Sequence, residues 1–91
     1  MKCFRYLISG KVQGVFFRQS AKIKADSLGL KGSAENLESG QVEIIICGAE
    51  NSLKEFDQWV LTGPPLAKVS TIEKHEVEEK NFEDFSILRK K

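Results

Sequence analysis

The segment at residues 9–21, SGKVQGVFFRQSA, places two glycines and an arginine where a strand-like run gives way to a helix-like run. Backbone N–H groups in such a loop can turn inward around one centre, and the positive end of the helix dipole faces the same centre. Gly14 permits the positive φ, or the close backbone approach, that this geometry requires. Gln13, Val15 and Phe16 would then contribute main-chain donors. The arrangement suits the binding of an oxyanion.

Arg18 adds a permanent charge to this loop. Its planar guanidinium can hold two oxygens of one phosphate, whereas a lysine would offer only a point charge. The residues alone also allow a simpler interpretation, in which Gly10 and Gly14 permit a tight connection and Arg18 is a solvated helix residue. Short glycine motifs occur often without a bound ligand, so both interpretations stay open at this level.

Length and charge limit the other possibilities. The chain has 91 residues, which predicts one domain over residues 1–91 with a single core. Fourteen lysines and arginines against 13 acidic residues give a net charge of +1, so an anion must be captured locally rather than by a global field. The short apolar run near the N-terminus is interrupted by Arg5 and resembles neither a secretory signal nor a membrane span. We expect a cytoplasmic protein.

Two amphipathic segments predict helices. Phe17, Ala21, Ala25 and Leu28 recur at helical spacing, and Gly29 follows at the position that commonly ends a helix. The second helix carries Leu53, Phe56, Trp59 and Val60 and is terminated by the sequence GPP. Five further segments predict strands: residues 2–9, Lys31–Asn36, 41–47, 67–79 with a possible bulge, and Phe85–Leu88.

The order β-α-β-β-α-β, with a short extra strand, predicts an α+β fold of the ferredoxin-like kind, an antiparallel sheet with two helices on one face. We expect the first and third strands to lie side by side and parallel. Cys3 and Cys47 would then sit at opposite ends of their strands, too far apart for a disulfide, although their number alone allows one. The sequence therefore predicts two free thiols. Neither cysteine has the spacing of a metal site.

The run from Ile8 to Arg18, ISGKVQGVFFR, resembles the first acylphosphatase signature at every specified position. A second block resembles the other signature of that family through the spacing of five residues, Gly32, Asn36, Gly40, Val42 and Gly48. The downstream GPPLAKV and the terminal Phe85-Ser-Ile also look like the family, so the resemblance covers nearly the whole chain.

This resemblance implies hydrolysis of an acyl phosphate to a carboxylate and inorganic phosphate, with no metal or organic cofactor. Arg18 would be the phosphate-binding arginine and Asn36 the residue that orients the attacking water. The loop from Gln13 to Phe17, including Gly14, Val15 and Phe16, would form the phosphate cradle. We expect a monomer that binds a small-molecule acyl phosphate and neither nucleic acid nor a membrane.

The chemistry of the residues agrees with this expectation. An acyl phosphate is a mixed anhydride with a good leaving group, so positioning and charge stabilisation can supply most of the catalysis. Asn36 can donate and accept at once, and the substrate phosphate can take the proton itself. Taken alone, Asn36 would more often bond its own turn. The sequence departs from the family pattern at Ser33 and Glu35, which should face away from Asn36 and affect stability or substrate range.

Other features receive simpler interpretations. His75 is expected to be an ordinary strand residue, and the terminal RKK a solvated end. The main alternative function is a non-enzymatic ferredoxin-like module that binds a phosphate-bearing ligand or RNA, but the aromatic RNA-binding signature is absent. A second alternative is a detached domain of a larger carbamoyl-transfer enzyme, whose N-terminal region resembles acylphosphatase. The absence of a linker weighs against it.

Overall fold

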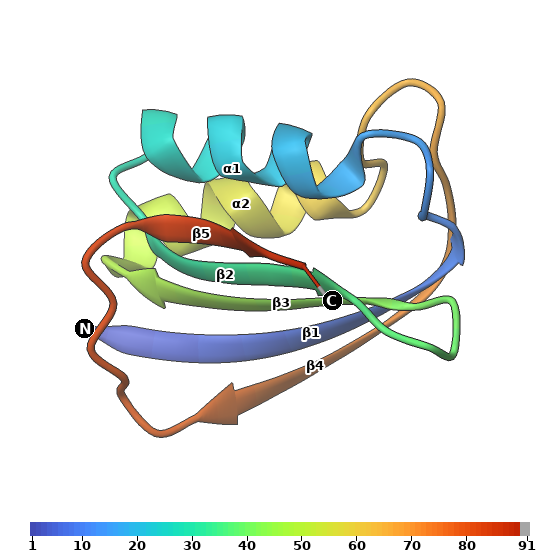
Figure 1. Ribbon diagram of the computed structural model, residues 1–91. Helices are drawn as coiled ribbons and strands as arrows, with labels where there is room; N and C mark the ends of the chain where they lie inside the picture. The colour runs from blue at the N-terminus through green and yellow to red at the C-terminus, as the bar shows by residue number, and fades with distance from the viewer. Residues whose placement is uncertain (90–91) are drawn as a thin grey trace.

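The computed structural model describes residues 1–89 as an α+β sandwich (Figure 1). No helix in this part of the chain is long and apolar enough to cross a membrane. The elements follow the predicted order and are, along the chain, β1 (Lys2–Lys11), α1 (Phe17–Ser27), β2 (Lys31–Asn36), β3 (Val42–Gly48), α2 (Glu50–Val60), β4 (Lys68–Val77) and β5 (Phe85–Leu88).

The five strands form one sheet in the order β4-β1-β3-β2-β5, and both helices cover the same face (Figure 1). The pairs among β1 to β4 are antiparallel, so the expectation that the first and third strands run parallel is wrong, although they are neighbours as expected. β5 runs parallel to β2 at the edge. After β4 the chain passes to the opposite edge and enters β5 in the direction of β2, so the sheet is mixed. This last strand ends beside the end of β2.

Alternation along the central strands builds the core. Tyr6 and Ile8 of β1 and Ile44 and Ile46 of β3 are almost fully buried on the helix-covered face. The helices pack against these strands with small, aliphatic and aromatic side chains. The most buried of them are Phe17, Ala21, Ala25, Leu53, Phe56 and Val60. Burial of one such large side chain stabilises the fold by about 1.5–3 kcal/mol. The amphipathic patterns therefore identified the faces correctly.

The prediction of two free thiols is wrong. Cys3 and Cys47 form a disulfide, with their Cα atoms 4.1 Å apart. The error came from strand direction: β1 and β3 are antiparallel, so Cys3 at the start of β1 lies directly opposite Cys47 near the end of β3. β3 lies between β1 and β2 and runs opposite to both, because a short turn at residues 37–41 joins it to β2 as a hairpin.

A bulge lies in the pairing of β1 with β4, as the broken alternation of residues 67–79 suggested. The register shifts between Ser9 and Gly10, which leaves Ser70 without an opposite residue. Gly10 has φ of 125°, and a Cβ atom there would lie 2.2 Å from the carbonyl oxygen of Lys68. Only glycine fits at this position, where the strand ends and the loop of interest begins.

A polar network joins α2 to β1. The buried hydroxyl of Tyr6 donates to Oδ1 of Asp57 at 2.6 Å, and Nζ of Lys74 lies 3.1 Å from the same oxygen. Burial raises the pKa of Tyr6 well above its usual range, and the bond to the Asp57 carboxylate raises it further. The network fixes the second helix against the sheet at a distance from the loop at residues 12–19.

Candidate active site

The backbone N–H groups of the loop between β1 and α1 donate to no other residue that the structure describes. None of the backbone hydrogen bonds that join turns, loops and caps within residues 1–89 has its donor in the segment 12–19. Gly14 has φ of 75° and Phe16, the N-cap of α1, has φ of 64°, so left-handed residues alternate along the loop. Such alternation curves successive N–H groups toward one point, which is the geometry of an anion-binding nest.

The start of α1 contributes to the same geometry. No side chain caps the helix, and no acidic residue lies in its first turn. Phe16 is the only residue other than glycine with a positive φ among those described, and this conformation costs it about 1 kcal/mol or more. The strain is stored where the loop meets the helix dipole, as is common at functional sites.

Gln13 fixes the loop from the opposite side. Its side-chain Nε2 donates to the carbonyl oxygens of Leu37 and Gln41, at 2.8 and 3.0 Å. These two residues flank the turn between β2 and β3, directly after Asn36. The loop and the end of β2 are therefore held in register with each other. The sequence did not reveal this bond, because it joins segments more than 20 residues apart.

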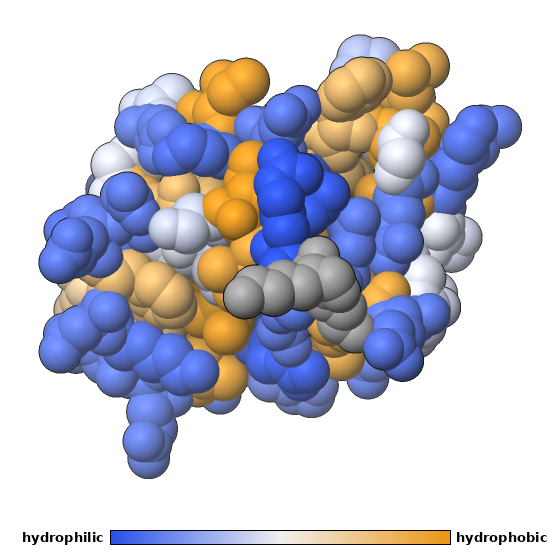
Figure 2. All heavy atoms as spheres, in the orientation of Figure 1, coloured by the Kyte–Doolittle hydropathy of each residue, from blue (hydrophilic) through white to orange (hydrophobic). Residues whose placement is uncertain are grey.

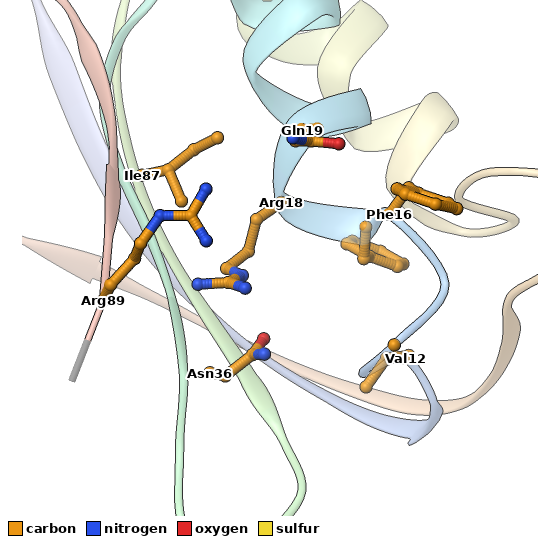
Figure 3. Close-up of a pocket in the computed structure, with 9 residues that line it drawn as sticks. Val12, Phe16, Arg18, Gln19, Asn36, Ile87 and Arg89 are labelled. Carbon is orange, nitrogen blue, oxygen red and sulfur yellow. The ribbon is translucent and has the colours of Figure 1, made fainter. Parts of the chain in front are cut away.

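The two residues predicted to be catalytic come together. Arg18, in the first turn of α1, and Asn36, at the end of β2, line one cavity of about 250 Å³. Figure 3 shows the Asn36 amide pointing toward the guanidinium of Arg18. The full lining is Val12, Gly14, Phe16, Phe17, Arg18, Gln19, Asn36, Ile87 and Arg89.

A second cavity, of about 420 Å³, opens beside the first. Both cavities are lined by Arg18, Asn36 and Arg89, which therefore form their common boundary. Gln13, Leu37, Glu38 and Leu88 complete the second one. Figure 2 shows strongly hydrophilic residues bordering hydrophobic ones near the centre of this face, where Figure 1 places the end of β5.

Not every predicted residue faces the first cavity. Gly14, Phe16 and Phe17 line it, Gln13 lines the second, and Val15 is buried in the core, 4% exposed. The sequence analysis assigned phosphate binding to the main-chain groups of these residues, so the positions of their side chains do not test that assignment.

Two other interpretations from the sequence, those of His75 and of the terminal RKK, can be compared with the structure. His75 lies in β4 and lines neither cavity, in agreement with its assignment as a strand residue. Arg89 is solvent-exposed, as expected for a chain end, yet its guanidinium faces the first cavity (Figure 3). The sequence analysis missed this residue. Lys90 and Lys91 lie outside the described residues.

Comparisons with known proteins show the family of the chain. The family model described as Acylphosphatase matches residues 4–87. An acylphosphatase of Alkalilimnicola ehrlichii is 48% identical over 84 residues, covering 92% of this chain and 94% of the relative.

Solved structures give the same result. The acylphosphatase of Coxiella burnetii, 40% identical, superposes with a TM-score of 0.91 over 96% of this chain and 92% of its own. That of Bacillus subtilis, 37% identical, superposes with a TM-score of 0.93 over 97% and 99%. The matching family and relatives are small hydrolases. The chain belongs to the acylphosphatase family. Membership of this family means that the chain is an enzyme, and the alternative of a non-enzymatic binding module is not supported.

Proposed function

We propose that this acylphosphatase binds the phosphate group of an acyl phosphate in the loop at residues 13–17, with Arg18 as its guanidinium ligand and Asn36 as the residue that orients the attacking water. The observation that carries the proposal is the meeting of Arg18, Asn36 and the unsatisfied loop in one cavity. Loop N–H groups and the start of α1 supply fixed donors to a dianion.

Charge stabilisation provides most of the rate in this scheme. As water adds to phosphorus, the bond from phosphorus to the acyl oxygen breaks, and negative charge spreads over the equatorial oxygens and the departing carboxylate. The Arg18 guanidinium and the loop donors are already in place and need no reorganisation when that charge develops. The carboxylate leaves as a weak base and needs no proton from the protein.

Asn36 positions the water without acting as a base. Its carbonyl oxygen accepts a hydrogen bond from the water, and its NH₂ group can donate to a phosphate oxygen or to the same water. The proton released by the water passes to an oxygen of the phosphate. The products are then a carboxylate and inorganic phosphate, and every atom of the water is accounted for.

Purified protein mixed with benzoyl phosphate tests the proposal. We expect cleavage well above the spontaneous rate, unaffected by a chelator, with competitive inhibition by inorganic phosphate because phosphate would occupy the same cradle. Activity that a chelator abolishes, or phosphate that fails to compete, would contradict the proposed site. The spontaneous rate is measured in parallel with heat-denatured protein.

A further inference from the structure

Arg89 lines both cavities but has no role in the mechanism proposed above. It shares their common boundary with Arg18 and Asn36. Figure 3 shows it reaching in from beyond the end of β5, with the guanidinium groups of Arg89 and Arg18 pointing toward one another. Two positive side chains directed at one hollow indicate a site for a ligand with more than one negative charge.

Strand parity explains why Arg89 faces the site. Ala34 of β2 lies opposite Ile87 of β5 in the parallel pairing, and Ile87 lines the first cavity. Two residues further along the chain come Asn36, the last residue of β2, and Arg89, which directly follows β5. Continued past Leu88, the alternation would place both on the same face. The register of β2 with β5 thus directs Asn36 and Arg89 toward the same end of the sheet, and both line the two cavities there.

Neither arginine is held in an ion pair with another described residue, although the carboxylate of Glu38 also lines the second cavity. Within residues 1–89 the ion pairs are Arg5 with Glu43, Lys22 with Asp26 and Lys74 with Asp57, and neither Arg18 nor Arg89 takes part. Arg18 has one hydrogen bond, from Nη1 to the carbonyl oxygen of Leu88, which leaves its other donors available. Like charges held close together repel unless an anion lies between them.

We infer that Arg89 is a second guanidinium ligand of the substrate phosphate, binding it on the side that faces the second cavity. Arg18 and the loop would hold the other oxygens, so the dianion is enclosed between two positive groups. This inference rests on the proposed function, because it assumes that the phosphate lies in the cradle. It adds a binding residue from the far end of the chain to the site formed by α1 and β2.

Three variants test the inference: Arg89→Gln removes the charge, Arg89→Lys keeps it without the planar fork, and Arg5→Gln is the matched control. Arg5 is paired with Glu43 at 2.6 Å and lines neither cavity, so its loss changes the net charge equally without touching the site. The measurements are KM and kcat for benzoyl phosphate and the inhibition constant of inorganic phosphate, all at low ionic strength.

For Arg89→Gln we expect KM and the phosphate inhibition constant to rise together by roughly tenfold, the effect of one charge-assisted hydrogen bond. Arg89→Lys should recover part of this loss, and Arg5→Gln should leave both constants unchanged. Arg89 is exposed and forms no hydrogen bond to another described residue, so an unchanged melting temperature will show that the fold is intact.

Two results would overturn the inference. If Arg89→Gln leaves the phosphate inhibition constant at the wild-type value, Arg89 does not bind phosphate. If Arg5→Gln raises the constants as much as Arg89→Gln does, the effect is one of net charge and not of position. Either result leaves the proposed function intact, because that is judged by turnover and phosphate inhibition in the wild-type enzyme.

Discussion

Nη1 of Arg18 donates a hydrogen bond to the carbonyl oxygen of Leu88, 3.1 Å away and 70 positions further along the chain. The bond uses one donor of the guanidinium and directs the rest toward the cavity. A long side chain in the first turn of a helix would otherwise sample many rotamers. The last strand therefore orients the arginine on which phosphate binding depends in our proposal.

Arg18→Lys should lower kcat/KM for benzoyl phosphate by about 10- to 100-fold, since hydrogen bonds to charged groups contribute about 1.5–3 kcal/mol each. Lysine keeps the charge but cannot bind Leu88 and phosphate in the same planar fork. Steady-state kinetics measure the effect. Arg5→Lys is the matched control and should retain full activity. Equal activity of the two variants would contradict the role of the fork.

Asn36→Ala should lower kcat by about 10²- to 10³-fold, the usual cost of one lost positioning or charge-stabilising group. Inorganic phosphate should still bind, because the loop donors and Arg18 remain. Turnover measures the first effect and calorimetric titration with phosphate the second. Asn81→Ala, in the exposed segment before β5, is the control. If Asn36→Ala loses phosphate binding along with turnover, the residue acts in binding and not on the water.

Reduction of the Cys3–Cys47 disulfide should destabilise the fold without removing the activity. The bond closes a loop of 44 positions, for which the chain-entropy model gives about 4 kcal/mol. The cysteines lie at the ends of β1 and β3 distant from Asn36 and the loop. Urea unfolding with and without dithiothreitol measures the change. The double variant Cys3→Ser with Cys47→Ser should show no response to the reductant; a response there would mean that the reductant acts elsewhere.

Tyr6→Phe should cost about 1–3 kcal/mol at pH 7, because the bond to the Asp57 carboxylate is lost. The pKa of Tyr6 is raised in the folded state, so its contribution is fully present below the unfolded pKa of about 10 and declines as the pH rises above it. Between pH 9 and 11 the wild type should therefore lose more stability than Tyr6→Phe does. Urea midpoints across this range measure the difference. Parallel losses would show that Tyr6 does not determine the alkaline sensitivity.

Periodicity predicted the elements well, because the helices and strands here bury one face each. The apolar residues of α1 and α2 came directly from that pattern. β2 and β5 have the expected bounds, although neither segment shows a clear alternation. The loop and Arg18 were candidates from the local sequence, but the residues alone also allowed a tight connection and a solvated arginine, and the family resemblance decided between the two. Asn36 was recognisable only through the family resemblance, since an asparagine before a turn has many uses.

What the sequence could not supply was the relation between distant segments. The antiparallel direction of β1 and β3 brings Cys3 and Cys47 together as a disulfide. The parallel register of β5 on β2 brings Arg89 to the cavity. The side-chain bonds of Gln13 depend equally on tertiary placement. None of these leaves a local pattern, because each depends on which strands become neighbours.

Because β5 lies at the edge of the sheet, the site depends on this strand staying paired with β2. This four-residue strand pairs on one side only, so it is the part of the sheet most easily peeled away. Detachment of β5 from β2 would break the hydrogen bond between Arg18 and the Leu88 carbonyl, and it would also move Arg89 away from the cavity. Phosphate binding and the pairing of β5 with β2 should therefore stabilise each other. A bound phosphate should act as a latch that slows amide exchange in β5.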